Sequence, residues 1–119
     1  MIPESWIRQA HIRLADHITV TPVTHDPDLD VYLKWENQQV TGSFKLRGAL
    51  NKAMVLEDWE RQAGLLTASA GNHGLGVALA GRILEVPVVV YASQNAVPTK
   101  LEAMRAQGAE LRLVPGGYG

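Results

Sequence analysis

The sequence contains no cysteine, so disulfides, thiolate nucleophiles and cysteine-ligated metal sites are excluded. An excess of charge of one sign is also absent, because 11 basic and 12 acidic residues leave a net charge of −1. Such a balanced surface does not favour nucleic acid or an anionic membrane as a partner. The longest strongly apolar run, residues 86–92, is far too short to span a bilayer.

Two further absences concern metal ligands and export. The four histidines do not show the paired spacing that is typical of metal ligands, and His11 and His17 fall on different faces of a helix. The first five residues lack the basic and apolar segments of a secretory signal peptide. We therefore expect a cytoplasmic protein without a bound metal.

Hydrophobic periodicity predicts an α/β architecture, in which a parallel sheet has flanking helices. Residues 86–91 are apolar on both faces, as is typical of a covered parallel strand. The remaining strands are expected at residues 20–24, 31–36, 65–69 and 110–114. Helices are expected at residues 3–17, at 44–59, from the glycine-rich turn after residue 69 to 84, and at 98–107.

Lys45 has an unusual position for a lysine, within the segment Thr41-Gly42-Ser43-Phe44-Lys45-Leu46-Arg47-Gly48-Ala49. Ser43 can cap the helix that begins here. The positive end of the helix dipole disfavours a cation at this place by a few tenths to about 1 kcal/mol. This favours the neutral amine that a lysine nucleophile needs near neutral pH. The same segment is also compatible with a solvated lysine beside a cap.

A second segment, Ser69-Ala70-Gly71-Asn72-His73-Gly74, follows an expected strand and precedes an expected helix. Free backbone N–H groups and the helix dipole converge at such a turn, so it favours an anion. Ser69 or Asn72 could instead simply cap the helix.

Together the two segments resemble the fold-type II pyridoxal-phosphate enzymes, in the branch of the threonine and serine dehydratases (ammonia-lyases) and serine racemases. The resemblance covers nearly the whole chain in consistent order. Its pieces are Leu33-Lys34-x-Glu36-x-x-Gln39-x-Thr41-Gly42-Ser43-Phe44-Lys45-x-Arg47-Gly48-Ala49, Ser69-Ala70-Gly71-Asn72-His73-Gly74, Thr21-Pro22, Ala96-Val97-Pro98-x-Lys100 and Arg105-x-x-Gly108-Ala109-Glu110.

The resemblance implies pyridoxal 5'-phosphate as the cofactor and gives roles to individual residues. Lys45 would be the Schiff-base lysine that holds the cofactor and moves the Cα proton of the substrate. Phe44 would pack against the pyridine ring, although it could also be a core residue. Asn72 would donate a hydrogen bond to the 3'-oxygen of the ring. The α-carboxylate of the amino-acid substrate would bind the turn formed by Ser69, Ala70, Gly71, Asn72 and His73.

Single residues separate the branches of this family. Cysteine synthase-like enzymes carry threonine where this chain has His73, and threonine synthase-like enzymes tend to have an acidic residue where it has Leu46. The implied reaction is therefore β-elimination from L-threonine or L-serine, which gives a 2-oxo acid and ammonia. Serine racemases place a serine at the position of Ala70, and because alanine cannot transfer a proton, elimination is expected over racemisation. Leu75 replaces the usual glutamine, which leaves the substrate open.

Family members are much longer, so the chain looks like an N-terminal fragment of an enzyme. The resemblance places residues 1–64 at the start of the large cofactor domain and residues 65–119 in a βαβαβ segment of the small domain. Residues 115–119 lie where the family begins its next helix, so we do not expect them to be the phosphate-binding loop. A homo-oligomer is expected at full length, and the 119 residues alone are expected to be inactive.

Three other interpretations stay open. A serine racemase-like activity, or that of another fold-type II lyase, is the alternative within the family. Glycines at 71, 74 and 76 superficially suggest a dinucleotide site, but residues 91–93 lack the acidic side chain that would bind the ribose. The chain could also be a non-catalytic fragment that folds poorly or acts only as an interaction module.

Overall fold

The computed structural model describes residues 1–116 of the chain. Most of segment 115–119, which we do not expect to bind the cofactor phosphate, therefore lies outside the described residues. In chain order the elements are α1 (Glu4–Leu14), β1 (Val23–Asp26), β2 (Val31–Lys34), the 3-10 helix η1 (Glu36–Gln38), α2 (Lys45–Met54), α3 (Asp58–Ala63), β3 (Leu65–Ala68), α4 (Asn72–Leu84), β4 (Val88–Ser93), α5 (Pro98–Ala106) and β5 (Glu110–Val114).

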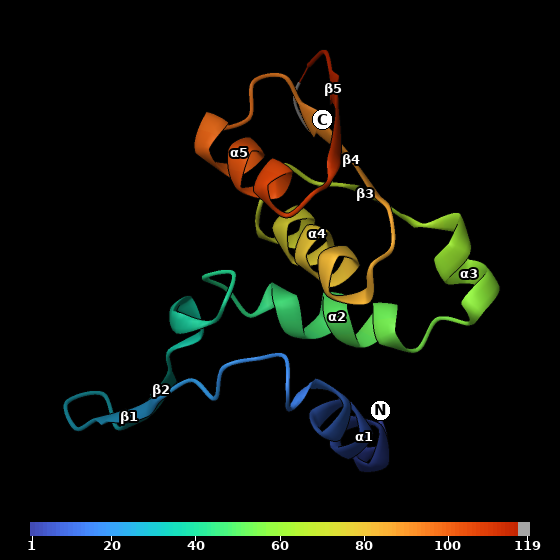
Figure 1. The fold of residues 1–119 in the computed structure, drawn as a ribbon. Helices are drawn as coiled ribbons and strands as arrows, with labels where there is room; N and C mark the ends of the chain where they lie inside the picture. The colour runs from blue at the N-terminus through green and yellow to red at the C-terminus, as the bar shows by residue number, and fades with distance from the viewer. Residues whose placement is uncertain (117–119) are drawn as a thin grey trace.

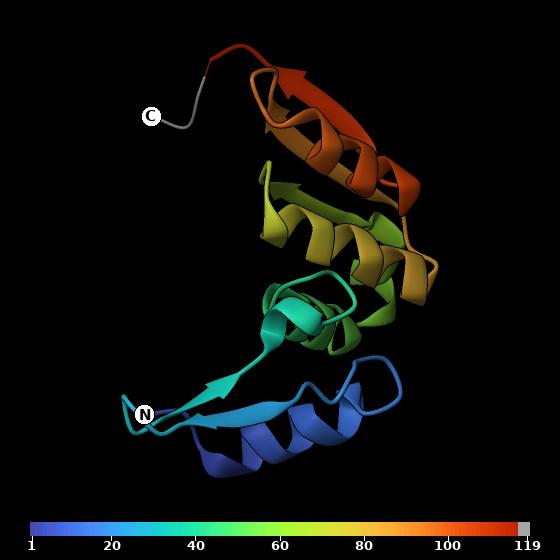
Figure 2. The ribbon, with the colours of Figure 1, turned by 90° about the vertical axis from the view of Figure 1, so that its left-hand side faces the viewer.

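The second half of the described chain forms a three-stranded parallel sheet with the order β3-β4-β5. The central strand β4 contains the buried residues Val88 and Val90. Helices α4 and α5 follow β3 and β4, and both lie along the same face of the sheet (Figures 1 and 2). The prediction of an α/β fold with a parallel sheet and flanking helices is confirmed.

The first two strands do not join this sheet, because β1 and β2 form a separate antiparallel hairpin. The strand expected at 20–24 begins later and extends to Asp26. The Asp26 carboxylate accepts hydrogen bonds from the backbone N–H groups of Asp28 and Leu29, so it closes the turn between the strands. The hairpin is open to solvent, with Tyr32 exposed on β2.

The single helix expected at 44–59 is in fact two helices, α2 and α3. The break arises because Glu57 and Glu60 form a capping box that starts a new helix. The guanidinium of Arg61 then donates to the carbonyl oxygens of Leu56 and Met54, which no longer have helical partners.

Helices α2 and α4 pack closely, and this contact positions the candidate site. Leu46 and Leu50 of α2 are fully buried, in a cluster with Leu79 of α4 and Leu14 of α1. Gly76 of α4 permits the close approach, because a Cβ atom there would lie 3.3 Å from the backbone nitrogen of Leu46. The beginning of α2 is therefore held against the first turns of α4. Within residues 1–116 no helix is long and apolar enough to cross a membrane.

Candidate active site

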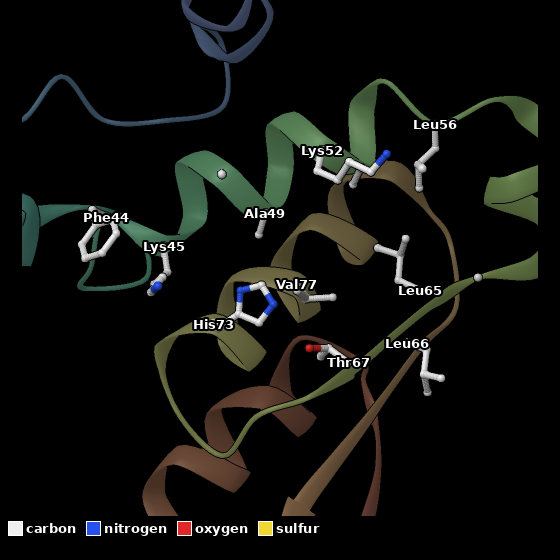
Figure 3. Close-up of a pocket in the computed structure, with 13 residues that line it drawn as sticks. Phe44, Lys45, Ala49, Lys52, Leu56, Leu65, Leu66, Thr67, His73 and Val77 are labelled. Atoms are coloured by element: carbon white, nitrogen blue, oxygen red, sulfur yellow. The ribbon is translucent and has the colours of Figure 1, made fainter. Parts of the chain in front are cut away.

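A cavity of about 490 Å³ lies between α2, α4 and β3 (Figure 3). Lys45 enters it from the first turn of α2 and His73 from the first turn of α4, so the two predicted segments meet at one place. The rest of the lining is mainly apolar. It consists of Phe44, Gly48, Ala49, Lys52, Ala53, Leu56, Gly64, Leu65, Leu66, Thr67 and Val77.

Lys45 is the first residue of α2, one position later than the expected start of the helix. The residue before the helix is Phe44, not Ser43 as predicted, and its side chain makes no capping hydrogen bond. Ser43 is buried, and its hydroxyl accepts a long hydrogen bond of 3.4 Å from the backbone N–H of Lys45. Among residues 1–116, no carboxylate lies within ion-pair distance of the Lys45 amine.

Phe44 lies beside this amine. The Nζ atom of Lys45 is 5.0 Å from the centroid of the Phe44 ring, a distance at which a cation and an aromatic face attract each other. The ring is 59% exposed, which excludes the interpretation of Phe44 as a core residue. An aromatic surface is therefore available to a flat ligand next to the amine.

The glycine-rich turn is anchored through Ser69. The N–H of Ser69 donates to the carbonyl oxygen of Tyr91 on β4, at 3.0 Å, and the hydroxyl of Ser69 accepts from the N–H of Gly71. Gly71 precedes α4 and Asn72 is its first residue. No side chain caps α4, so Ser69 and Asn72 do not have the simple capping role that the sequence left open.

The structure brings some of the predicted site residues together and not others. Lys45, Phe44 and His73 line the same cavity, whereas Ser69, Ala70, Gly71 and Asn72 do not line it. These four residues precede His73 directly in the chain, and Asn72 is the first residue of α4. The cofactor and substrate contacts assigned to Asn72 and to the turn stay predictions.

Lys52 and Thr67 also line the cavity, and neither belongs to the two predicted segments. Lys52 lies seven residues after Lys45, two helical turns further along α2, so helical periodicity could have placed both lysines on one face. Thr67 comes from β3, and no local pattern in the sequence indicates that this strand lies across from α2.

Met104 of α5 packs against Gly74, in the first turn of α4. Its side chain is fully buried, and a Cβ atom added to Gly74 would lie 3.0 Å from its Cε atom and 2.5 Å from the carbonyl oxygen of Ser69. Gly74 therefore leaves no room for a side chain between α4, α5 and the turn. The two residues are 30 positions apart, and no sequence signal connects them.

A charged cluster precedes Lys45 in the chain. Glu36 accepts two hydrogen bonds of 2.8 Å from the guanidinium of Arg47 and one of 2.6 Å from the hydroxyl of Thr21. The hydrogen bonds from Arg47 are the main cause that lowers the pKa of Glu36, which is about 2 despite the opposing effect of burial. The same pairing raises the pKa of Arg47. The sequence motif includes both residues, but the sequence alone gave them no role.

Comparison with known proteins agrees with this geometry. The family model described as "Pyridoxal-phosphate dependent enzyme" matches residues 14–119. An L-threonine ammonia-lyase of Geobacter sulfurreducens is 40% identical over 120 aligned residues, which cover 95% of this chain and 30% of that protein. An L-threonine ammonia-lyase of Thermotoga maritima is 46% identical over 84 residues, or 71% of this chain and 21% of that protein.

Among solved structures, the serine racemase of Dictyostelium discoideum superimposes with a TM-score of 0.88 at 34% identity. The superposition covers 94% of this chain and 38% of that one. The chain thus spans less than a third of the two curated relatives named here, and just over a third of the racemase. The match to the family model covers both predicted motifs, the lysine segment and the glycine-rich turn, and continues to the end of the parallel sheet. The chain belongs to the family of pyridoxal-phosphate dependent enzymes.

Proposed function

We propose that the chain supplies the lysine and the carboxylate-binding turn of an ammonia-lyase that acts on L-threonine or L-serine. The products would be a 2-oxo acid and ammonia. The observation that carries this proposal is that Lys45, without a carboxylate partner among the described residues, lines the same largely apolar cavity as His73. The names of the two L-threonine ammonia-lyases support the choice of reaction.

The residues around the cavity fit pyridoxal 5'-phosphate. Lys45 offers a primary amine to an aldehyde, and Phe44 offers an exposed ring next to it. Lys45 would hold the cofactor, Phe44 would pack on its ring, and Asn72 would donate to its 3'-oxygen. When bound, the cofactor supplies an electron sink for the negative charge that develops at Cα.

The residues of the chain have separate tasks in this proposal. The Lys45 amine accepts the Cα proton of the amino acid. The turn from Ser69 to His73 holds the α-carboxylate, because the free N–H groups and the dipole at the start of α4 favour an anion there. The methyl side chain of Ala70 has no exchangeable proton, so it cannot return a proton to Cα.

A racemase-like activity is the second candidate, and the similarity to the Dictyostelium serine racemase supports it. Ala70 argues against it for the reason just given. An amino acid as the small-molecule partner, a cytoplasmic location and a homo-oligomer complete the proposal.

The test is to identify the lysine that reacts with the cofactor. Purified protein is titrated with pyridoxal 5'-phosphate, reduced with borohydride, and digested so that the labelled peptide can be sequenced. We expect the label on Lys45. We expect Lys45→Ala to abolish this label and, in the complete enzyme, ammonia release from L-threonine. Lys52→Ala is the matched control, since Lys52 lines the same cavity and its loss should leave the label on Lys45. A label on Lys52, or full turnover by Lys45→Ala, would contradict the proposal.

A further inference from the structure

We infer that Glu36 and Arg47 form a positioning pair, which holds the segment before α2 in place and so determines where the Lys45 amine lies. The inference rests on the function proposed for Lys45. Neither residue lines the cavity, so they can affect the position of the Lys45 amine only through the backbone between residues 36 and 47.

The pair joins the two ends of the segment from Glu36 to Arg47, a loop that contains Lys45. Glu36 begins η1, and Arg47 lies in the first turn of α2, two residues after Lys45. The Nε and Nη2 atoms of Arg47 donate to the two carboxylate oxygens of Glu36, both at 2.8 Å. This two-pronged geometry fixes orientation as well as distance, which a single contact would not do.

Further contacts restrain both residues. The hydroxyl of Thr21, which is only 3% exposed, donates to Glu36 at 2.6 Å, and the Lys34 amine lies 3.9 Å from the same carboxylate oxygen. The backbone N–H of Arg47 donates to the carbonyl oxygen of Phe44 at 3.1 Å. Arg47 is therefore bonded through its side chain to the start of the loop and through its backbone to the end.

Gln39 anchors the middle of the same loop. Its side chain is buried and pairs with the backbone of Thr19, accepting from the N–H at 2.8 Å and donating to the carbonyl oxygen at 2.9 Å. The carbonyl oxygen of Gln39 then accepts from the N–H of Gly42 at 2.7 Å. With the middle and both ends fixed, the loop leaves the start of α2 little freedom.

Burial distinguishes this pair from an ordinary surface ion pair. The side chains of Glu36 and Arg47 are 17% and 30% exposed, whereas those of Glu4 and Arg8 in α1 are 76% and 75% exposed at similar distances. Exposed pairs contribute little because water competes for both charges. Loss of one partner from the less exposed pair leaves the other without the two hydrogen bonds of the pair, which is more costly.

The experiment compares Glu36→Gln and Arg47→Lys with Glu4→Gln, which removes a carboxylate of the exposed pair. Three quantities are measured: amide hydrogen exchange of residues 39–46 without cofactor, the apparent dissociation constant for pyridoxal 5'-phosphate from visible absorption, and the urea midpoint. The first two are recorded without denaturant, where circular dichroism shows that each variant is folded. Arg47→Lys keeps the charge but loses the two-pronged geometry, so it tests the geometry even if Glu36→Gln fails to fold.

We expect faster exchange in residues 39–46 and a roughly tenfold weaker cofactor affinity in both variants, the size that loss of a charged hydrogen bond implies. Glu4→Gln should change neither quantity. A lower urea midpoint with unchanged exchange and unchanged affinity would show a purely structural pair and overturn the inference. The failure of the proposed function is a different result: the wild-type protein would then show no absorption band that depends on Lys45.

Discussion

Gly74→Ala tests whether the turn after β3 needs the close packing that the structure shows. A methyl group at this position would lie 2.5 Å from the carbonyl oxygen of Ser69, and a backbone atom cannot rotate away as a side chain can. Overpacking of this kind costs typically about 1–3 kcal/mol. Alanine recovers up to about 1 kcal/mol of helix propensity relative to glycine. We therefore expect a net loss of roughly 1–2 kcal/mol of unfolding free energy.

Gly48→Ala is the matched control, because Gly48 is an exposed helical glycine. Within residues 1–116, no heavy atom lies within 4 Å of a Cβ atom added to it. Gly48→Ala should stabilise the protein by up to about 1 kcal/mol. Urea unfolding should thus separate the two variants by about 1 M in midpoint, for a slope of about 1–3 kcal/mol per molar. Because Ser69 has to move, Gly74→Ala should also raise KM for the amino acid in the complete enzyme. Equal midpoints, with KM unchanged, would refute the packing argument.

Two further predictions concern Glu36 and Ala70. The pKa of Glu36 is about 2 in the folded protein against an ordinary 4.5, so its stabilisation is present above pH 4.5 and is lost as the pH falls toward 2. The difference in unfolding free energy between the wild type and Glu36→Gln should therefore be smaller at pH 3.5 than at pH 7. A difference that does not change with pH would show that the ion pair is not the source of this stabilisation. Ala70→Ser restores a hydroxyl, so in the complete enzyme the ratio of D-serine formed to pyruvate released from L-serine should rise. An unchanged ratio would mean that position 70 does not control the reaction face.

The sequence predicted the parallel part of the fold well because each element there has its own local signal. Strand β5 lies at residues 110–114 as expected, and α5 begins at the expected Pro98. The glycine-rich turn leads into α4, and Lys45 lies at the start of α2. These features depend on apolar periodicity, proline and glycine, which are all visible within a few residues.

The errors arose where long-range contacts or competing caps decide the structure. One helix was expected to continue to residue 59, but α2 ends at Met54 and the Glu57–Glu60 capping box starts α3. The hairpin forms a sheet of its own, and local patterns do not say which strands pair. The contact of Gly74 with Met104, and that of Thr67 with the cavity, join residues from different elements, so periodicity could not predict them.

The candidate site depends on two helix N-termini that are brought together by one packed interface. Lys45 and His73, which is in the first turn of α4, belong to segments more than 20 residues apart. They line one cavity because Leu46 and Gly76 allow α2 and α4 to pack in close contact. A shift of either helix along this interface would move the amine relative to the turn. Since a proton can be moved only when donor and acceptor are within hydrogen-bond reach, the packing of α2 on α4 is as necessary to the proposed chemistry as the lysine itself.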